Sequence, residues 1–229
     1  MKFGIFLAVL LLKVAVVWAG DTLRSDTVLF SSGPPVKFKA GTIVEYNQFH
    51  KVISGTPAQT VSLWTTGPLV SFSSSGSVKF NKSGRVISGI PANDFSAECV
   101  NGEYITVEKN FRTIFDKNGK VEYCRSADGF EVDLKAGRFI VKPGGLTVFY
   151  SSGILNCGET DEKLLLKTAS GIYIFVSPYG RVYFDEKGFL QKAVLAKRTI
   201  FFLKDNTKVE RLHGSTVSFD ADGFLINDF

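Results

Sequence analysis

Histidine, cysteine and methionine are scarce in this chain of 229 residues, which contains two, three and one of them. The two histidines, His50 and His213, stand in segments that read as turns, without a nucleophile or a further metal ligand at a recognisable spacing. The patterns GxxxxGK[ST], GxSxG, HExxH and CxxC are all missing. We therefore expect no catalytic residue, no metal site and no cofactor.

One acidic cluster is a candidate for chemistry. Glu159, Asp161 and Glu162 lie within four residues of one another, and a pair of carboxylates is the machinery of most glycosidases. A solvated connecting loop accounts for the same residues, and that is the interpretation we prefer.

Long hydrophobic runs are missing outside the first twenty residues. Residues 1–19 combine a basic second residue, an apolar run that Lys13 interrupts, and small residues before Ala19, which is the order of a secretory signal peptide. The run is too short for a membrane span of about 20 residues, although an uncleaved anchor is the alternative. We expect cleavage near Ala19 and a secreted or periplasmic chain of residues 20–229 without a transmembrane segment.

A strong excess of one charge is also missing. The chain has 27 Lys and Arg against 22 Asp and Glu. Loss of Lys2 and Lys13 with the leader leaves 25 against 22, a net charge of +3. A weakly basic balance gives no reason to expect nucleic acid as a partner.

What the chain has is a repeat of about 35 residues. The stretch VYFDEKGFL at 182–190 returns as VSFDADGFL at 217–225, and the glycine of FDxxG serves as a marker of each unit. The markers are Gly84, Gly119, Gly153, Gly188 and Gly223, with His50 in the equivalent position of the first unit. Their spacings of 34 or 35 residues predict six units within a single domain, residues 20–229.

Other columns of the repeat favour β-strands. An aromatic residue stands four positions before every marker, at Tyr46, Phe80, Phe115, Phe149, Phe184 and Phe219. β-Branched residues alternate with polar ones around it, and turn signals separate two further strands upstream. The sequence therefore predicts an all-β protein whose units each contain four antiparallel strands.

The FDxxG motif itself is typical of a hairpin turn. The Asp or Asn side chain accepts hydrogen bonds from the backbone ahead of it, and the glycine takes the left-handed conformation that closes a type I turn with a bulge. A calcium loop is the alternative for Asp220–Gly223, but most units lack the further oxygen ligands that it needs. We interpret the marker glycines as structural.

Two architectures suit units of this size. Stacked hairpins make an open β-array or solenoid, whereas six closed four-stranded units make a six-bladed propeller. We prefer the open array because 35 residues is short for a blade and no strand is shared between the chain ends.

The segments GRVISG, GKVEYC and FDKNGKV resemble the NGKV-x-x-G repeats of exported bacterial proteins related to MORN-type repeats. The resemblance extends over all six units. It implies a β-repeat scaffold, often without a known activity, and it carries over no catalytic residue.

Two further columns change character along the chain, one residue after the marker and five before it. The candidate binding residues in these columns are Lys51, Lys79, Arg85, Lys120, Ile154, Tyr183, Phe189 and Phe224. The first four suit an anionic partner and the rest an aromatic platform, and we expect Lys79 to pair across its hairpin with the marker-plus-one row. Lysines that discourage edge pairing and a second buried core are the alternatives.

Three cysteines allow at most one internal disulfide, and free buried thiols are the alternative. Cys124 lies five residues after its marker and Cys157 four after its own, so we expect them on opposite faces of their strands, without a bridge.

These observations favour an exported, non-enzymatic β-repeat protein that binds a macromolecule or serves as an envelope-associated scaffold. Its partner would be an anionic envelope polymer or another protein. The alternative function is a lectin-like or carbohydrate-active propeller.

Overall fold

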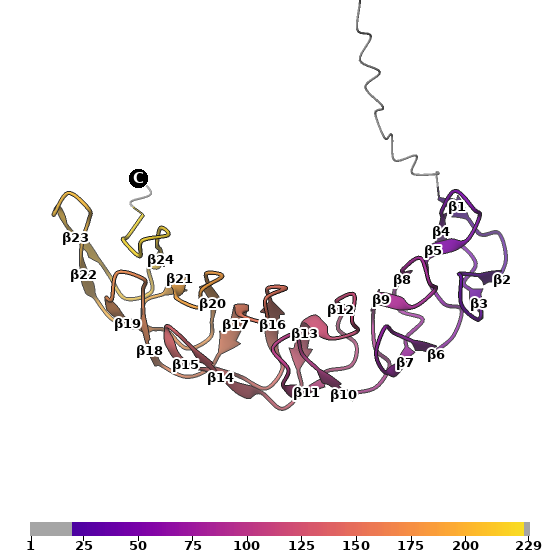
Figure 1. The fold of residues 1–229 in the computed structure, drawn as a ribbon, viewed down its shortest axis with the longest axis horizontal. Helices are drawn as coiled ribbons and strands as arrows, with labels where there is room; N and C mark the ends of the chain where they lie inside the picture. Colours follow the sequence, from indigo (N-terminus) through magenta and orange to yellow (C-terminus); the bar gives the residue numbers. More distant parts are fainter. Residues whose placement is uncertain (1–19, 227–229) are drawn as a thin grey trace, which may run out of the picture.

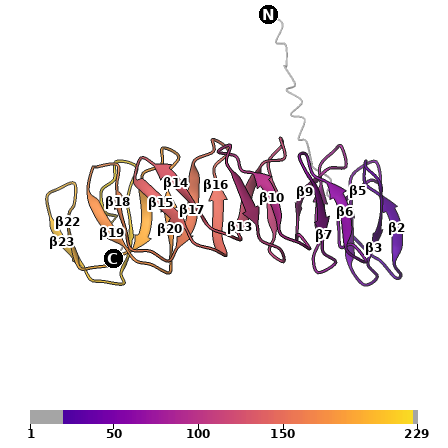
Figure 2. The ribbon, with the colours of Figure 1, turned by 90° about the horizontal axis from the view of Figure 1, so that it is seen from below.

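The computed structural model describes residues 20–226, and over that range the chain forms 24 β-strands and no helix. The strands build an open crescent with a long sheet on its concave side and short hairpins on its convex side (Figure 1). A view at right angles shows the same hairpins side by side along the length of the molecule (Figure 2). The all-β class and the open arrangement are confirmed, while the expected signal peptide lies outside the described residues.

The concave sheet is antiparallel, and its strands follow one another in chain order, although every second connection passes through a convex hairpin. In spatial order its strands are β1 (Asp21–Thr22), β4 (Ile43–Tyr46), β5 (Val52–Gly55), β8 (Val78–Phe80), β9 (Val86–Gly89), β12 (Thr113–Phe115), β13 (Val121–Ser126), β16 (Gly145–Phe149), β17 (Leu155–Thr160), β20 (Gly180–Phe184), β21 (Leu190–Val194) and β24 (Thr216–Ser218). The sheet does not close, as a propeller would require.

The convex layer consists of antiparallel hairpins that alternate along the chain with the hairpins of the sheet. They are β2–β3 (Thr27–Phe30 and Pro35–Phe38), β6–β7 (Val61–Trp64 and Leu69–Phe72), β10–β11 (Phe95–Glu98 and Tyr104–Val107), β14–β15 (Phe130–Leu134 and Gly137–Val141), β18–β19 (Leu164–Lys167 and Tyr173–Val176) and β22–β23 (Thr199–Phe202 and Lys208–Arg211). β11 also joins the concave sheet, because Val107 pairs with Ser126 of β13.

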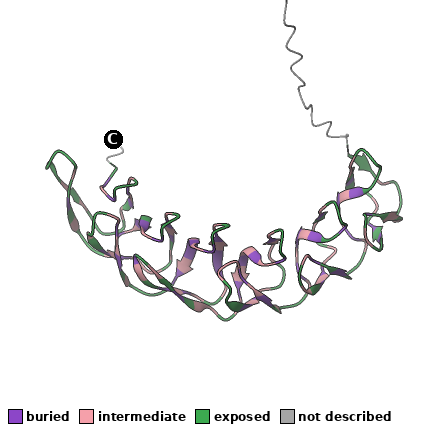
Figure 3. Ribbon diagram, in the orientation of Figure 1, coloured by how far each residue is buried: buried purple, intermediate pink, exposed green. Residues whose placement is uncertain are grey.

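The core lies between the two layers and runs the whole length of the crescent (Figure 3). Five of the aromatic residues four positions before the markers are at most 5 % exposed, and Tyr46 at the first unit is half-buried. Successive side chains of a strand point to opposite faces, so the pleat that buries these rings turns the intervening residues toward the concave surface.

Every marker turn has the same backbone geometry. In the third unit the Gly119 N–H donates to Asp116 O at 3.1 Å, the Asp116 N–H donates to Lys120 O at 2.8 Å, and Gly119 has a φ of 86°. Asp116 Oδ1 accepts the N–H groups of Asn118 and Lys120 at 2.8 Å each. This is a four-residue turn closed by a left-handed residue and tightened by an aspartate.

Close packing is a second reason for glycine at the markers. A Cβ on Gly119 would overlap the backbone nitrogen of Gly67, because the turn of the β6–β7 hairpin lies against it. A Cβ on Gly84 or Gly223 would overlap the convex turn of the preceding unit in the same way, whereas Gly153 and Gly188 face that turn with more room. His50 is exposed with a φ of 54°. The described residues contain no convex hairpin of a preceding unit to pack against this turn, which explains why a side chain is tolerated there.

The two layers also fit together by size, because small residues of the sheet lie opposite large side chains of the convex layer. Gly55 and Gly89 leave room for the rings of Phe38 and Phe72, since a Cβ on either glycine would lie 2.6 or 2.5 Å from a ring carbon. In the third unit the larger Cys124 takes the glycine position. Large convex side chains are thus matched to small sheet residues, which fixes the distance between the layers.

Candidate functional site: the concave face of the sheet

A single row of side chains crosses the concave face, and it is defined by strand register. The row contains Glu45, Ser54, Lys79, Ser88, Ile114, Tyr123, Val148, Cys157, Tyr183, Lys192 and Ser218, each paired with the next. Adjacent strands are about 4.8 Å apart, so the eleven residues span about 50 Å. We call them the concave row. Their apolar middle is flanked by two exposed lysines, Lys79 and Lys192.

Arginines lie beside the concave row, two residues before or after one of its members. Arg125 shares β13 with Tyr123 and therefore its face, and Arg112 directly precedes β12. The Arg112 side chain donates to Ser88 Oγ at 3.1 Å. Arg125 stacks over the Phe111 ring at 4.6 Å, and that ring stacks on Tyr123 with centroids 5.6 Å apart. The result is a cationic and aromatic surface at the middle of the sheet.

One hollow of about 500 Å³ opens on this face where the second and third units meet. Lys79 and Arg112 contribute cations to it, Ser77 and Ser88 contribute hydroxyl groups, and Ile114 contributes apolar surface. Two cations beside hydroxyl donors are suited to a carboxylate, sulfate or phosphate group.

One carboxylate lies at the other end of the apolar middle. Glu159 accepts a hydrogen bond from Arg181 Nε at 3.1 Å and lies 3.9 Å from Lys142 Nζ. Burial alone would raise its pKa, but the Arg181 bond, the Leu146 N–H and the nearby Lys142 outweigh burial and lower the pKa. Glu159 is therefore held ionised by its partners in a strand, whereas Asp161 and Glu162 are exposed.

The thiols do not provide a nucleophile on this face. Burial is the main cause that raises the pKa of Cys157 to about 11, so its thiolate is scarce at neutral pH. The strand register confirms the opposite orientations expected of Cys124 and Cys157, because they pair with the consecutive residues Thr147 and Val148.

Among residues 20–226 no cluster of three His, Cys, Asp or Glu is placed to hold a metal ion.

The marker-plus-one residues lie elsewhere, on the side of the crescent where the marker turns meet the convex turns. We call this side the marker edge. Arg85 lies 5.7 Å from the centroid of the Trp64 ring, and Lys120 binds Glu98 at 2.6 Å. In later units the ring belongs to the marker-plus-one residue and the cation to the convex layer. Phe189 lies under Lys167 and Phe224 under Lys204, at 5.9 and 5.7 Å from ring centroid to Nζ. The change from basic to aromatic residues along this column thus preserves contacts between the layers.

The eight candidate residues therefore separate into two groups. Lys79 and Tyr183 belong to the concave row, whereas the six marker-plus-one residues lie at the marker edge. The expectation that Lys79 pairs with the marker-plus-one row is wrong, because Lys79 pairs with Ser54 and Ser88. The turn pairs Phe80 with Val86, and the bulge beside this pair inserts one residue, so that the partner of Lys79 is Ser88 and not Arg85.

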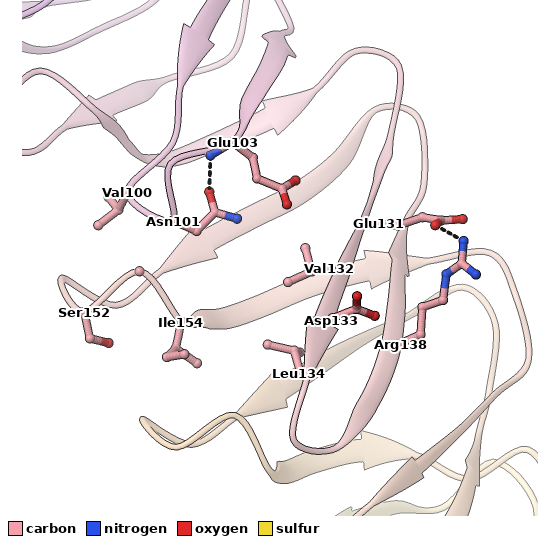
Figure 4. A pocket seen from close by; sticks show the side chains of 11 residues that line it. Val100, Asn101, Glu103, Glu131, Val132, Asp133, Leu134, Arg138, Ser152 and Ile154 are labelled. Atoms are coloured by element: carbon pink, nitrogen blue, oxygen red, sulfur yellow. Dashed lines mark hydrogen bonds and ion pairs between the residues drawn. The ribbon is translucent and has the colours of Figure 1, made fainter.

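Ile154 lines the larger pocket of about 650 Å³, between the convex hairpins β10–β11 and β14–β15 (Figure 4). Glu103, Glu131 and Asp133 contribute three carboxylates to its wall, and the one cation, Arg138, is paired with Glu131. Negative potential in this pocket disfavours an anionic group. The two hollows differ in charge, and the one on the concave face is the better match for an anion.

Nearly half of the concave row was not identified from the sequence. The residues four positions after the markers, such as Ser88, Tyr123 and Lys192, are set on this face by the bulge. A register drawn without the extra residue assigns them to the wrong face. The FDxxG pattern was the available signal, since a G1 bulge always adds one residue to a strand.

No helix in residues 20–226 is long and apolar enough to cross a bilayer. In comparisons with known proteins, no protein-family model and no curated protein sequence matches the chain. The resemblance to MORN-type repeats stays a prediction.

Proposed function

We propose that the protein is an exported, non-enzymatic scaffold of six β-repeat units that binds an extended anionic macromolecule along the concave face of its sheet. The observation that carries the proposal is the concave row, an unbroken line of side chains across eleven strands of an open sheet, in which Glu45 at one end is the only carboxylate. A linear polymer needs a long surface of this kind, because each of its segments makes only weak contacts that must be repeated.

The charge of the face supports an anionic partner. Lys79, Arg112 and Lys192 have no carboxylate partner among the ion pairs of the described residues, whereas Arg181 is paired with Glu159. Tyr123 and Tyr183 add half-exposed rings between these cations, and rings of this kind stack on sugars or on planar groups. A carboxylated polysaccharide of an envelope satisfies both features.

The test is a titration of the mature chain with fluorescent polygalacturonate, a linear carboxylated polysaccharide. Exposed ion pairs are worth about 0.2–1 kcal/mol each, so the triple variant Lys79→Gln, Arg112→Gln, Lys192→Gln should bind about tenfold more weakly. The matched control changes Lys82, Lys117 and Lys187 to Gln. These lysines are exposed in marker turns, and the control removes the same charge.

Binding should weaken in both proteins as salt rises, and neutral dextran should not compete. Equal losses in the two variants would show that net charge alone attracts the polymer. Absence of binding by the unaltered chain at low salt would exclude carboxylated polysaccharides as the partner.

A further inference from the structure

The convex hairpins β18–β19 and β22–β23 carry a second surface, at the C-terminal end of the crescent (Figures 1 and 2). Leu166, Ile174 and Phe201 of these hairpins point into the core and are at most 1 % exposed. The alternate side chains point outward, and the large apolar ones are Leu165 at 47 %, Tyr173 at 61 %, Ile200 at 44 % and Phe202 at 55 % exposure. We call these four residues the convex patch.

Cations surround the convex patch. Lys163 and Lys197 lie over the Phe175 ring at 4.9 and 3.9 Å, and Lys197 joins the two hairpins because it precedes β22 while Phe175 belongs to β19. Lys167 and Lys208 pair directly with Tyr173 and Phe202 across their hairpins. Glu210 is the one carboxylate within these four strands, and it is already paired with Arg198.

We propose that the convex patch docks the protein on the surface of a membrane that contains anionic lipid. Apolar side chains that project from a rigid sheet can enter the boundary between headgroups and acyl chains, while long lysine side chains reach the phosphates. A membrane of this kind provides both parts, a negative surface for the lysines and an apolar layer for Leu165, Ile200 and Phe202.

The charge distribution disfavours a second copy of the chain as the occupant. Two convex patches placed face to face would bring their lysines together without carboxylates to compensate them. A soluble polyanion would pair with the lysines but would leave the four apolar side chains in water. Docking by the convex patch would leave the concave face free, so the two surfaces can be tested separately.

The experiment is sedimentation of the mature chain with vesicles of phosphatidylcholine that contain about one third phosphatidylglycerol, against vesicles of phosphatidylcholine alone. The variant Leu165→Thr, Ile200→Thr, Phe202→Thr keeps β-forming residues at exposed strand positions and should partition about tenfold less. Its control changes Val28, Phe30 and Leu69 to Thr, because these are exposed by 51–56 % on the convex hairpins at the other end.

A second pair of variants tests the charges. Lys163→Gln, Lys167→Gln, Lys208→Gln should lose binding to the anionic vesicles, whereas the changes of Lys82, Lys117 and Lys187 to Gln should not. The concave variant Lys79→Gln, Arg112→Gln, Lys192→Gln should bind vesicles like the unaltered chain, which separates this proposal from the proposed function.

Three results would overturn the proposal. One is equal binding to neutral and anionic vesicles, and another is full binding by the convex-patch variant. The third is a dimer in sedimentation equilibrium that the convex-patch variant abolishes, since that would identify a second copy as the occupant.

Discussion

At the scale of single residues, the marker glycines are set by two independent constraints, and the structure separates them. Gly119 combines a positive φ with direct packing on the turn of the β6–β7 hairpin. Gly188 has nearly the same φ, 85°, but a Cβ there would lie 3.4 Å from the backbone nitrogen of Lys135, which is ordinary contact. Conformation alone therefore acts at Gly188, and conformation plus overlap acts at Gly119.

Alanine substitution distinguishes these two cases. Gly188→Ala should cost about 1–2 kcal/mol for the left-handed conformation. Gly119→Ala should cost about 2–5 kcal/mol, because the overlap with the neighbouring turn adds about 1–3 kcal/mol. Urea unfolding at neutral pH measures both free energies. Equal losses would show that the convex turn does not pack on the marker.

The buried thiols predict a loss of stability at alkaline pH. Burial is the main cause that raises the pKa of Cys99 to about 12 and of Cys157 to about 11, from an ordinary value of 9.0. The folded state thus favours the neutral thiol. This contribution is complete below pH 9 and is lost as pH rises toward 11 and 12.

The free energy of unfolding should therefore fall between pH 9 and 11, and Cys157→Ala should reduce that slope. Iodoacetamide at pH 8 should modify the folded chain far more slowly than the chain in urea, because the thiolate is both rare and enclosed. Rapid alkylation of Cys157 in the folded chain would contradict its burial.

At the scale of the element, each unit depends on an aromatic ring held between a sheet hairpin and a convex hairpin. Phe149 is 3 % exposed and stacks on Phe130 of β14, with ring centroids 6.4 Å apart. Phe149→Ala should cost about 3–5 kcal/mol of unfolding free energy. Phe130→Ala should cost less, since Phe130 is only half-buried. A loss below about 1 kcal/mol at Phe149 would remove this column from the core.

The strands and hairpins could be predicted from the sequence alone. The period of 34 or 35 residues, the aromatic column and the FDxxG turns are local patterns, and local patterns specify strands and hairpins. The two layers were harder to predict, because the match between Phe38 and Gly55 depends on residues that are distant in the chain. Only the residues five positions before the markers could be assigned to the concave row from the sequence. The bulge at each turn shifts the register of the following strand, and the alternation of polar and apolar residues does not reveal this shift.

A further column of left-handed residues was not predicted from the sequence. Asn110 and Tyr179 have φ of 60° and 65° in loops on the side opposite the marker edge, at positions where Gly144 and Gly214 occur in other units. Asparagine tolerates this conformation, but tyrosine rarely adopts it. Tyr179 is 82 % exposed, and nothing in the structure explains why a tyrosine occupies this left-handed position.

At the scale of the whole molecule, the open sheet makes the particle long. A compact globule of about 210 residues has a radius of gyration of about 17 Å. Small-angle scattering of residues 20–229 should give a clearly larger radius of gyration and a distance distribution with an extended tail. A radius near that of a compact globule would indicate a closed ring, and would remove the continuous concave face.

The most direct test of the binding surface is acetylation footprinting of lysines, with and without saturating polygalacturonate. Our account predicts that acetylation of Lys79 and Lys192 slows when the polymer is bound, because both lie in the concave row. Acetylation of Lys82, Lys117 and Lys187, in the marker turns, should continue at its original rate. Protection of the marker-turn lysines with Lys79 and Lys192 left reactive would contradict the account and place the partner on the marker edge.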